Sequence, residues 1–538
     1  MSVTKRILAC VISVFLSSIA IAEPPARPNI LVLMAEDMSL RVGAFGDEVA
    51  VTPNIDRLAS EGVRYPNTFT TAGVCAPSRA AHITGMHQNS FGGQHMRTAS
   101  SPLGSYRAVP PPQVKAYPEL LRAAGYYTWT GRKLDYQFSG PMANSGPFSI
   151  WDQEGGAGHW RNRRPDQPFF GLVNFNVTHE SRIFGSAKAI AVPRELEVSP
   201  NSVEVPPYYP DTAAVRTDIA RHYNNIAKMD RQVGEVLQQL EAEGLADSTI
   251  VIWTTDHGDG LPRAKRDLFD AGIKVPMIIL WPRAYRPEGV IPGSIDTRLV
   301  SFVDLAPTLL RLAGVSLPAY LQGRDIVIDQ SRDYIYASRD RIDEVTDRQR
   351  AVRDKRYKYI RSWYPQQPGG HHLAFRDNLK MMGELWQLLE EGKLNDQQRQ
   401  WFEPPGKERL FDLREDPFEL NNLAADPAHR ATLERMRAAL AAWQGEVQDW
   451  GEQSEAEMVA SFQPGGKVPT TEPPEISFRA GKLTLSSNTS RASMGYRING
   501  GQWQLYSRPV DIAGAVEIQA KAVRYGWDES EVTIKTSP

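Results

Sequence analysis

Residues 29–37 read NILVLMAED, and this stretch decides which class of fold the sequence can adopt. The run over residues 29–34 lacks the alternation of polar and apolar residues that marks a strand with one face in water. It therefore predicts a strand that is buried on both faces, as in a parallel sheet covered by helices. The strand is followed by Glu36 and Asp37. These residues lie at its carboxyl end, where open parallel sheets bind ligands.

The chain beyond this strand alternates apolar strands with helices. A short helix over residues 53–62 has Pro53 at its start and Gly62 at its end. Further strands are predicted over residues 126–129, 169–177, 250–253 and 276–281. Further helices are predicted over residues 117–125 and 212–240. This alternation predicts an α/β sandwich with a central, mostly parallel sheet.

Polar side chains collect at the ends of these predicted strands. His179 follows one strand, and Asp256 and His257 follow another, as Glu36 and Asp37 follow the first. A single aspartate after a strand is commonly a helix cap or a turn former. Three such places, two of them holding adjacent metal-type ligands, favour a binding site at one edge of the sheet.

The first 22 residues are predicted to be a signal peptide. Lys5 and Arg6 precede an apolar run over residues 7–21, and Ala20 and Ala22 fit a cleavage site. An N-terminal membrane anchor is the alternative, but the run is short for a spanning helix. We therefore expect a periplasmic or secreted protein that is free of the membrane after cleavage. The net charge of −2 gives no reason to expect a nucleic-acid partner.

The chain contains two cysteines, Cys10 and Cys75. Removal of the signal peptide would leave Cys75 alone, so the mature chain could form no internal disulfide. An unpaired thiol in an oxidising compartment is either a liability or a reagent.

The residues around this cysteine resemble the signature of a known enzyme family. The segment reads Cys75-Ala76-Pro77-Ser78-Arg79 and is followed by Thr84 and Gly85. It resembles the motif of the formylglycine-dependent sulfatases, and further blocks extend the resemblance over residues 28–425. The resemblance implies an alkaline phosphatase-like fold.

The resemblance also implies that Cys75 is oxidised to formylglycine (3-oxoalanine). A formylglycine-generating enzyme or an anaerobic sulfatase-maturing enzyme would be the partner in this step. One hydroxyl of the aldehyde hydrate attacks sulfur, and the other, once deprotonated, expels the sulfate. A buried structural thiol is the plain alternative, but it leaves Pro77 and Arg79 unexplained.

A divalent metal site follows from the same resemblance. The family places two acidic ligands after the first strand and an Asp-Asn or Asp-His pair after a later one. The corresponding residues here are Glu36, Asp37, Cys75, Asp256 and His257. This oxygen-rich set suits calcium, with magnesium as the alternative. The imidazole of His257 also suits softer ions and keeps the identity of the metal open.

Four further residues match catalytic positions of the family. Arg79, Lys133 and Lys265 would bind the sulfate and stabilise the charge that develops on it. His179 would donate a proton to the leaving alcohol. Asp256 is also placed to take a proton from the hydrate.

One departure from the family concerns its Gly-Lys-x-His block. The histidine that assists sulfate release in the family is replaced here by Asp135. Asp135 takes that role in one interpretation. In the other, a histidine from elsewhere does so, and the candidates are His82, His87, His95, His371 and His372.

The composition changes along the chain, and these changes predict how it divides into domains. We predict a signal peptide over 1–22, an N-terminal catalytic domain over 23–333 and an α+β C-terminal subdomain over 334–460. A linker over 461–475 then leads to a small β-sandwich over 476–538. Asn499-Gly500-Gly501 indicates a hairpin in this last part. The module resembles the fibronectin-like modules of bacterial carbohydrate enzymes.

The expected function is hydrolysis of sulfate esters on a sulfated oligo- or polysaccharide, either an algal one such as ulvan or a glycosaminoglycan. Two alternatives stay open. The first is a formylglycine-dependent hydrolase of phosphate or phosphonate esters. The second is a non-catalytic homologue that binds carbohydrate.

Overall fold

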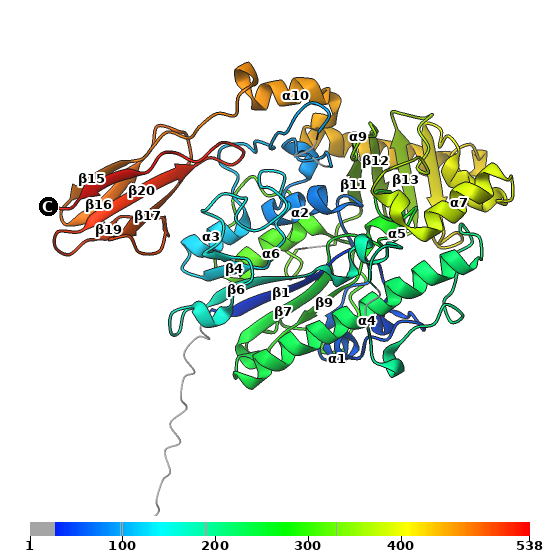
Figure 1. The fold of residues 1–538 in the computed structure, drawn as a ribbon, viewed down its shortest axis with the longest axis horizontal. Helices are drawn as coiled ribbons and strands as arrows, with labels where there is room; N and C mark the ends of the chain where they lie inside the picture. The colour runs from blue at the N-terminus through cyan, green and yellow to red at the C-terminus, as the bar shows by residue number, and fades with distance from the viewer. Residues whose placement is uncertain (1–26, 97, 99–100, 189–190, 330) are drawn as a thin grey trace, which may run out of the picture.

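The computed structural model describes residues 27–96, 98, 101–188, 191–329 and 331–538 (Figure 1). The predicted signal peptide and Cys10 lie outside these residues. Within them, no helix combines the length and the apolar character needed to cross a membrane.

A seven-stranded sheet forms the centre of the larger part of the molecule. Its strands run in the order β2-β9-β7-β1-β6-β4-β5. Their bounds in that order are Val63–Arg64, Met277–Leu280, Thr249–Thr255, Asn29–Ala35, Phe169–Phe175, Tyr127–Thr130 and Gln153–Glu154. The five strands from β7 to β5 are parallel to one another, whereas β9 and β2 are antiparallel to their neighbours. The prediction of a mostly parallel sheet is therefore confirmed.

Helices cover both faces of this sheet (Figure 1). On β1, Ile30 and Val32 pack on one side with the helices α2, α3 and α6. Leu31 and Leu33 pack on the other side with α1 and α4. The helices α1, α2, α3, α4 and α6 span Pro53–Glu61, Cys75–Thr84, Tyr117–Ala123, Ala213–Ala242 and Leu305–Leu312. All seven residues of β1 are buried, as the unbroken apolar run predicts.

A small second sheet and a short helix lie beside the large sheet. The sheet has the order β10-β3-β8. These strands span Val300–Ser301, Thr68–Phe69 and Lys274–Val275, and the helix α5 spans Asp270–Ile273.

A four-stranded antiparallel sheet follows in the C-terminal subdomain, in the order β11-β12-β13-β14. These strands span Ile335–Arg339, Gln349–Arg353, Tyr357–Ser362 and Glu408–Asp412. The helices α7, α8 and α9 span Lys380–Glu390, Asp396–Arg399 and Arg430–Val447. Helix α9 packs on one side of the sheet. On the other side, Ala351 and Ile360 share a core with Val215 and Ile219 of α4. The two parts are therefore joined by a common apolar core.

The last part of the chain forms two small packed sheets. The helix α10, Glu455–Phe462, leads to them, so the predicted linker over 461–475 begins inside a helix. One sheet contains β15, β16 and β19, and the other contains β18, β17, β20 and β21. The strands β15 to β21 span Glu475–Arg479, Lys482–Ser486, Ser493–Ile498, Gln504–Tyr506, Val510–Asp511, Glu517–Val523 and Thr533–Thr536. Apolar side chains from both sheets meet between them.

The small module docks on helix α3 through a buried carboxylate. Glu119 is buried and accepts hydrogen bonds from Tyr525 Oη (2.6 Å), Ser493 Oγ (2.5 Å) and the Ser149 hydroxyl. The ring of Tyr525 also stacks on Phe138 at 4.8 Å. These contacts join the module to the larger part of the molecule.

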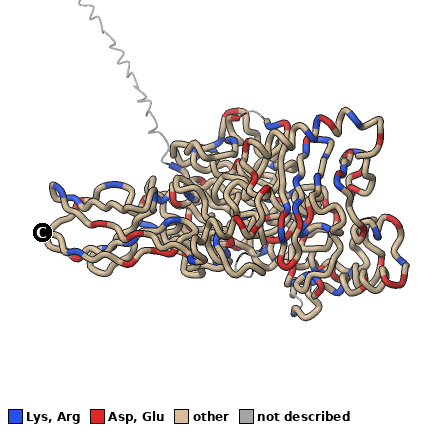
Figure 2. Tube along the Cα trace, turned by 90° about the horizontal axis from the view of Figure 1, so that it is seen from above, with Lys and Arg blue, Asp and Glu red and all other residues tan. Residues whose placement is uncertain are grey.

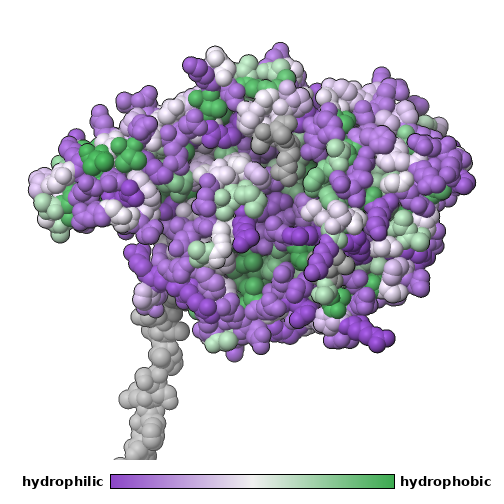
Figure 3. All heavy atoms as spheres, in the orientation of Figure 1, coloured by the Kyte–Doolittle hydropathy of each residue, from purple (hydrophilic) through white to green (hydrophobic). Residues whose placement is uncertain are grey.

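Charged residues of both signs are interspersed along the trace (Figure 2). The face in Figure 3 is mostly hydrophilic, with apolar residues in separate clusters. This surface agrees with the small net charge of −2.

Candidate active site

The candidate site lies at the carboxyl edge of the large sheet, where three adjacent strands end. Ala35, the last residue of β1, pairs with both Phe175 of β6 and Thr255 of β7. The residues that follow these three strands are therefore brought to one level. Strand β6 is two residues shorter than predicted, because the backbone turns into a 3-10 helix, Asn176–Thr178, immediately before His179.

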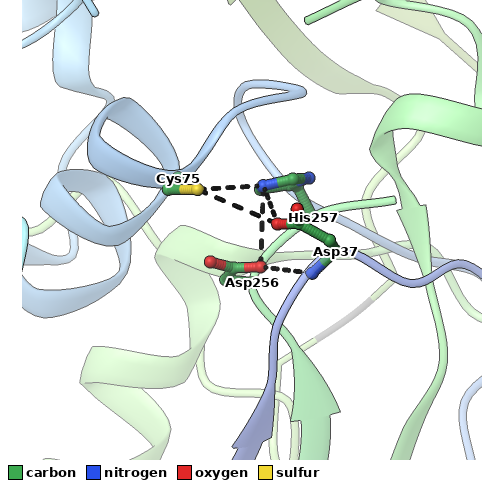
Figure 4. Close-up of side chains that lie close together, drawn as sticks. All are labelled: Asp37, Cys75, Asp256 and His257. Carbon is green, nitrogen blue, oxygen red and sulfur yellow. Dashed lines mark hydrogen bonds and ion pairs between the residues drawn. The ribbon is translucent and has the colours of Figure 1, made fainter. Parts of the chain in front are cut away.

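Cys75 is the first residue of α2 and also belongs to the site. Its side chain is fully buried. Its Sγ lies 3.3 Å from Nε2 of His257 and 3.9 Å from Oδ1 of Asp37 (Figure 4). Burial raises the pKa of this thiol, but the nearby ammonium groups of Lys133 and Lys265 outweigh burial and hold the pKa well below its usual value. The position thus favours an anionic atom at residue 75.

Four of the predicted metal ligands converge on one point. Each of Asp37, Cys75, Asp256 and His257 offers an atom within 4.8 Å of the others (Figure 4). Asp37 has a left-handed backbone with φ of 50°, and its main-chain N–H donates to Oδ1 of Asp256 at 3.1 Å. Two buried carboxylates with an imidazole form a donor set that fits a divalent cation.

Glu36 is set slightly apart from these four. It is grouped with Asp37 and His179, and its Oε2 accepts from Lys133 Nζ at 3.0 Å. Its other oxygen, Oε1, is buried and makes no hydrogen bond among the described residues. Burial raises the pKa of Glu36 despite the attraction of Lys133 and Arg79. Its role as a ligand stays a prediction.

Three predicted sulfate-binding cations surround these carboxylates. Arg79, one turn after Cys75, donates through Nε to Oδ2 of Asp256 at 2.9 Å. Lys265 contacts Oδ2 of Asp37 at 2.5 Å, and Lys133 contacts Glu36. All three cations are buried. They can therefore act on a bound anion with little screening by water.

His179 differs from the other site residues because it is only half-buried. Its Nδ1 lies 2.8 Å from Ser181 Oγ and accepts from the Ser181 N–H at 3.3 Å. This acceptor role leaves the proton of a neutral imidazole on Nε2. His179 thus stands at the mouth of the site with a proton to donate.

Sequence reasoning missed three residues that hold these groups in place. Glu180 is fully buried, forms an ion pair with Lys265 Nζ at 2.9 Å and accepts from Arg266 Nη1 at 2.9 and 3.0 Å. Burial raises the pKa of Glu180, but Arg266 and Lys265 outweigh burial and lower it to about 2. Asn174 accepts from Arg79 Nη1 at 2.7 Å. Glu180 and Arg266 directly follow His179 and Lys265, and this adjacency is the one local signal that points to them.

Asp135 lies in the loop after β4, buried, with φ of 63°. The charge of Asp135 is among those that raise the pKa of Arg79, so the two side chains are close enough to interact. Asp135 therefore stands near Arg79, one of the predicted sulfate-binding cations, and its catalytic role stays a prediction.

The candidate histidines lie in different surroundings. His82 packs edge-on against Tyr117 at 5.5 Å and Phe302 at 5.8 Å, and burial followed by the charge of Arg79 lowers its pKa to about 3. His87 packs against Trp443 at 5.0 Å, and burial lowers the pKa of both His87 and His95, to about 3 and about 4. Burial therefore favours the neutral form of these three histidines, and a role for one of them in sulfate release stays a prediction.

The remaining two, His371 and His372, belong to a loop of the C-terminal subdomain. His371 Nδ1 lies 2.7 Å from the carbonyl oxygen of Pro368, and His372 stacks on Trp386. Among the described residues, only His179 and His257 are grouped with the candidate metal ligands.

Comparison with known proteins finds two family models that match this chain. The sulfatase family model matches residues 28–315, and the model of the N-sulphoglucosamine sulphohydrolase C-terminal region matches residues 263–370. An ulvan-active sulfatase of Formosa agariphila is 40% identical over 561 aligned residues, which cover 95% of this chain and 92% of the relative. Human N-sulphoglucosamine sulphohydrolase is 28% identical, over 79% of this chain and 91% of the relative.

Solved structures share the fold. A sulfatase from Bacteroides thetaiotaomicron superposes with a TM-score of 0.58 at 22% identity, over 80% of this chain and 94% of the other. A 2-O GAG sulfatase gives a TM-score of 0.57 at the same identity and coverage.

Proposed function

The chain belongs to the sulfatase family, and we propose that it removes sulfate from a sulfated polysaccharide, with ulvan as the first candidate. It is a sulfuric ester hydrolase. The observation that carries the proposal is the convergence of Asp37, Cys75, Asp256 and His257 on one point at the sheet edge. The substrate follows the relative of Formosa agariphila, because the match spans nearly the whole of both chains.

We propose that Cys75 is the precursor of the nucleophile. Its sulfur occupies the place that the oxygens of a formylglycine hydrate would take. The burial of Cys75, its place at the start of α2 and the Cys-x-Pro-Ser-Arg sequence support this assignment. The hydrate supplies one hydroxyl to attack sulfur and a second to release the sulfate. A formylglycine-generating or anaerobic sulfatase-maturing enzyme would be needed as a partner.

The surrounding residues are proposed to act on the sulfate and on two protons. Arg79, Lys133 and Lys265 bind the sulfate oxygens and stabilise the charge that grows on them in the transition state. Asp256, whose carboxylate lies within 4.8 Å of the Cys75 sulfur, accepts the proton of the attacking hydroxyl. His179 gives the proton on Nε2 to the leaving sugar oxygen.

Residue 75 and the side chains of Asp37, Asp256 and His257 are proposed to hold a divalent cation, with Glu36 close by. Calcium is the proposed ion and magnesium the alternative, because the donors are mainly carboxylate oxygens. When bound, the ion supplies Lewis-acid polarisation at the reacting centre. Binding can be followed without turnover, since an ion held by the folded chain raises the thermal unfolding temperature. Calcium should raise this temperature more than magnesium in chelator-treated protein. No rise with either ion would contradict the site, and so would an equal rise in the Asp256→Asn variant.

The region over residues 1–22 is proposed to direct export to the periplasm or beyond the cell. Its charged start, apolar run and small residues before position 23 support this assignment. An extracellular polysaccharide would meet the enzyme there.

The proposed function is tested on native protein from a host that matures sulfatases. Mass analysis of the peptide over residues 73–87 should show loss of sulfur at Cys75, and sulfate should be released from ulvan oligosaccharides. The Cys75→Ser variant should bind these oligosaccharides and not turn them over. A free thiol at residue 75, or a phosphate ester turned over faster than the sulfate ester, would contradict the proposal.

A further inference from the structure

Phe375 is a large apolar side chain that stays 43% exposed beside the candidate general acid. Its ring centroid lies 6.2 Å from that of His179, in an edge-to-face arrangement. On its other side it packs against Phe184 at 5.0 Å. A single exposed phenylalanine is common on protein surfaces and indicates no function by itself. Here, however, the exposed ring lies next to His179, the half-buried residue of the site.

We infer that Phe375 is the platform on which the sugar carrying the scissile sulfate stacks. The inference rests on the proposed function and adds to it the residue that recognises the sugar ring. The groups that would take the sulfate, Lys133, Lys265 and Arg79, are all buried in the site. The sugar itself must therefore lie outside them, next to His179, where Phe375 offers an uncovered aromatic ring.

The loop that carries Phe375 is held rigidly within the C-terminal subdomain. Gly370 N donates to the carbonyl of Trp401 at 2.7 Å, and a Cβ at Gly369 would come within 2.4 Å of the Trp401 ring. Arg376 is 1% exposed, lies over the Trp401 ring at 4.6 Å and donates to the carbonyls of Gly369 and His371. An aromatic ring on such a loop is positioned before any ligand binds, which lowers the entropic cost of binding.

The same loop contacts the two chain segments that carry Lys265 and His179, the first through Trp401 and the second directly. Asp267, two residues after Lys265, accepts from Trp401 Nε1 at 3.0 Å. At the other end of the loop, the carbonyl of Asn378 accepts from Gly185 N at 3.3 Å, in the segment that follows His179. Phe375 therefore keeps a defined place relative to both the sulfate-binding lysine and the proton donor.

The chemistry of a sugar fits this place. Carbohydrate sites combine aromatic surfaces for the apolar face of the ring with a few polar groups that fix its orientation. Stacking on Phe375 would hold the ring while His179 faces the bridging oxygen. Inorganic sulfate, the product, has no ring and gains nothing from Phe375. The platform should therefore affect the binding of the saccharide and leave the affinity for sulfate unchanged.

The test uses the matured full-length enzyme and two measurements. Sulfate release from ulvan oligosaccharides gives KM and kcat, and inhibition by inorganic sulfate gives an affinity for the anion alone. Phe375→Ala should raise KM about tenfold, because the ring removed buries apolar surface on the sugar. Its inhibition constant for sulfate should match that of the wild-type enzyme. Phe375→Trp should keep KM close to the wild-type value, because an indole ring also stacks.

Phe418→Ala is the matched control. Phe418 is 42% exposed and makes one edge-to-face contact, with Tyr208 at 6.1 Å, away from His179. This variant should keep both constants. An unchanged KM in Phe375→Ala would overturn the inference, and so would an equal loss of affinity for saccharide and for sulfate, which marks a collapsed site. A wild-type enzyme that releases no sulfate would instead refute the proposed function, and the inference with it.

Discussion

Replacing Glu180 by glutamine removes one buried negative charge and changes little in shape. Glu180 accepts a hydrogen bond on each oxygen from Arg266 Nη1, and its Oε2 also forms an ion pair with Lys265 Nζ. The amide oxygen can keep a contact with each cation, but it carries no charge, so Arg266 and Lys265 both lose the carboxylate that neutralises them. Breaking a buried ion pair in this way costs about 3–5 kcal/mol, so we expect a loss of about 4 kcal/mol.

Two measurements follow for Glu180→Gln. The urea concentration at which the protein unfolds should fall markedly, because about 4 kcal/mol is a large share of the stability of a typical protein. The kcat/KM for sulfated saccharide should fall roughly 100-fold, because Lys265 loses one of the two carboxylates that hold it.

Glu241→Gln serves as the control for this variant. Glu241 pairs with Arg57 at 2.9 Å on the surface, where both side chains are about half exposed. Its loss should change the free energy of unfolding by about 1 kcal/mol or less. If Glu180→Gln were as stable as Glu241→Gln and kept its kcat/KM within about twofold of the wild-type value, the role assigned to Glu180 would be refuted.

Three further predictions concern other parts of the molecule. His179→Gln should slow hydrolysis of sugar sulfates about 100- to 10,000-fold; an aryl sulfate, whose leaving group needs no proton, should lose much less, and equal losses would argue against His179 as the acid. The folded-state pKa of His82, about 3, lies below the value of about 6.5 for an exposed histidine. Above pH 6.5 His82 is neutral in both states, so it costs the folded state no stability. As the pH falls toward 3 the unfolded state binds a proton at His82 first, and the free energy of unfolding falls. His82→Leu should therefore remove about 1.4 kcal/mol of the destabilisation seen in urea unfolding between pH 7.5 and 5.5; an identical pH dependence in both proteins would contradict the assignment. Glu119→Gln should loosen the docking of the C-terminal module, because the hydroxyls of Tyr525 and Ser493 lose a buried charged acceptor; limited proteolysis should then cut faster between residues 463 and 475, and an unchanged rate would show that the apolar contacts suffice.

The sequence by itself predicted the main strands of the large sheet, its mostly parallel character and the candidate residues at the strand ends. The unbroken apolar run over residues 29–34 could only be a doubly buried strand, and β1 is buried throughout. Carboxylates and histidines directly after strands were readable because the ends of parallel strands meet at one edge. The Cys-x-Pro-Ser-Arg block pointed to Cys75 through its resemblance to the sulfatase motif, which lies within five consecutive residues. Patterns of this kind involve neighbouring residues only, so they can be recognised without knowledge of the fold.

The tertiary structure alone decided which distant segments meet at this edge. Glu180 holds Lys265 across 85 positions of chain, and Phe375 reaches His179 from another subdomain. The same holds for the packing of His82 against Tyr117 and Phe302, which no local pattern predicted. Burial and the charges of neighbouring side chains set the roles of these residues. Both depend on contacts between segments far apart in the chain, and no local pattern encodes them.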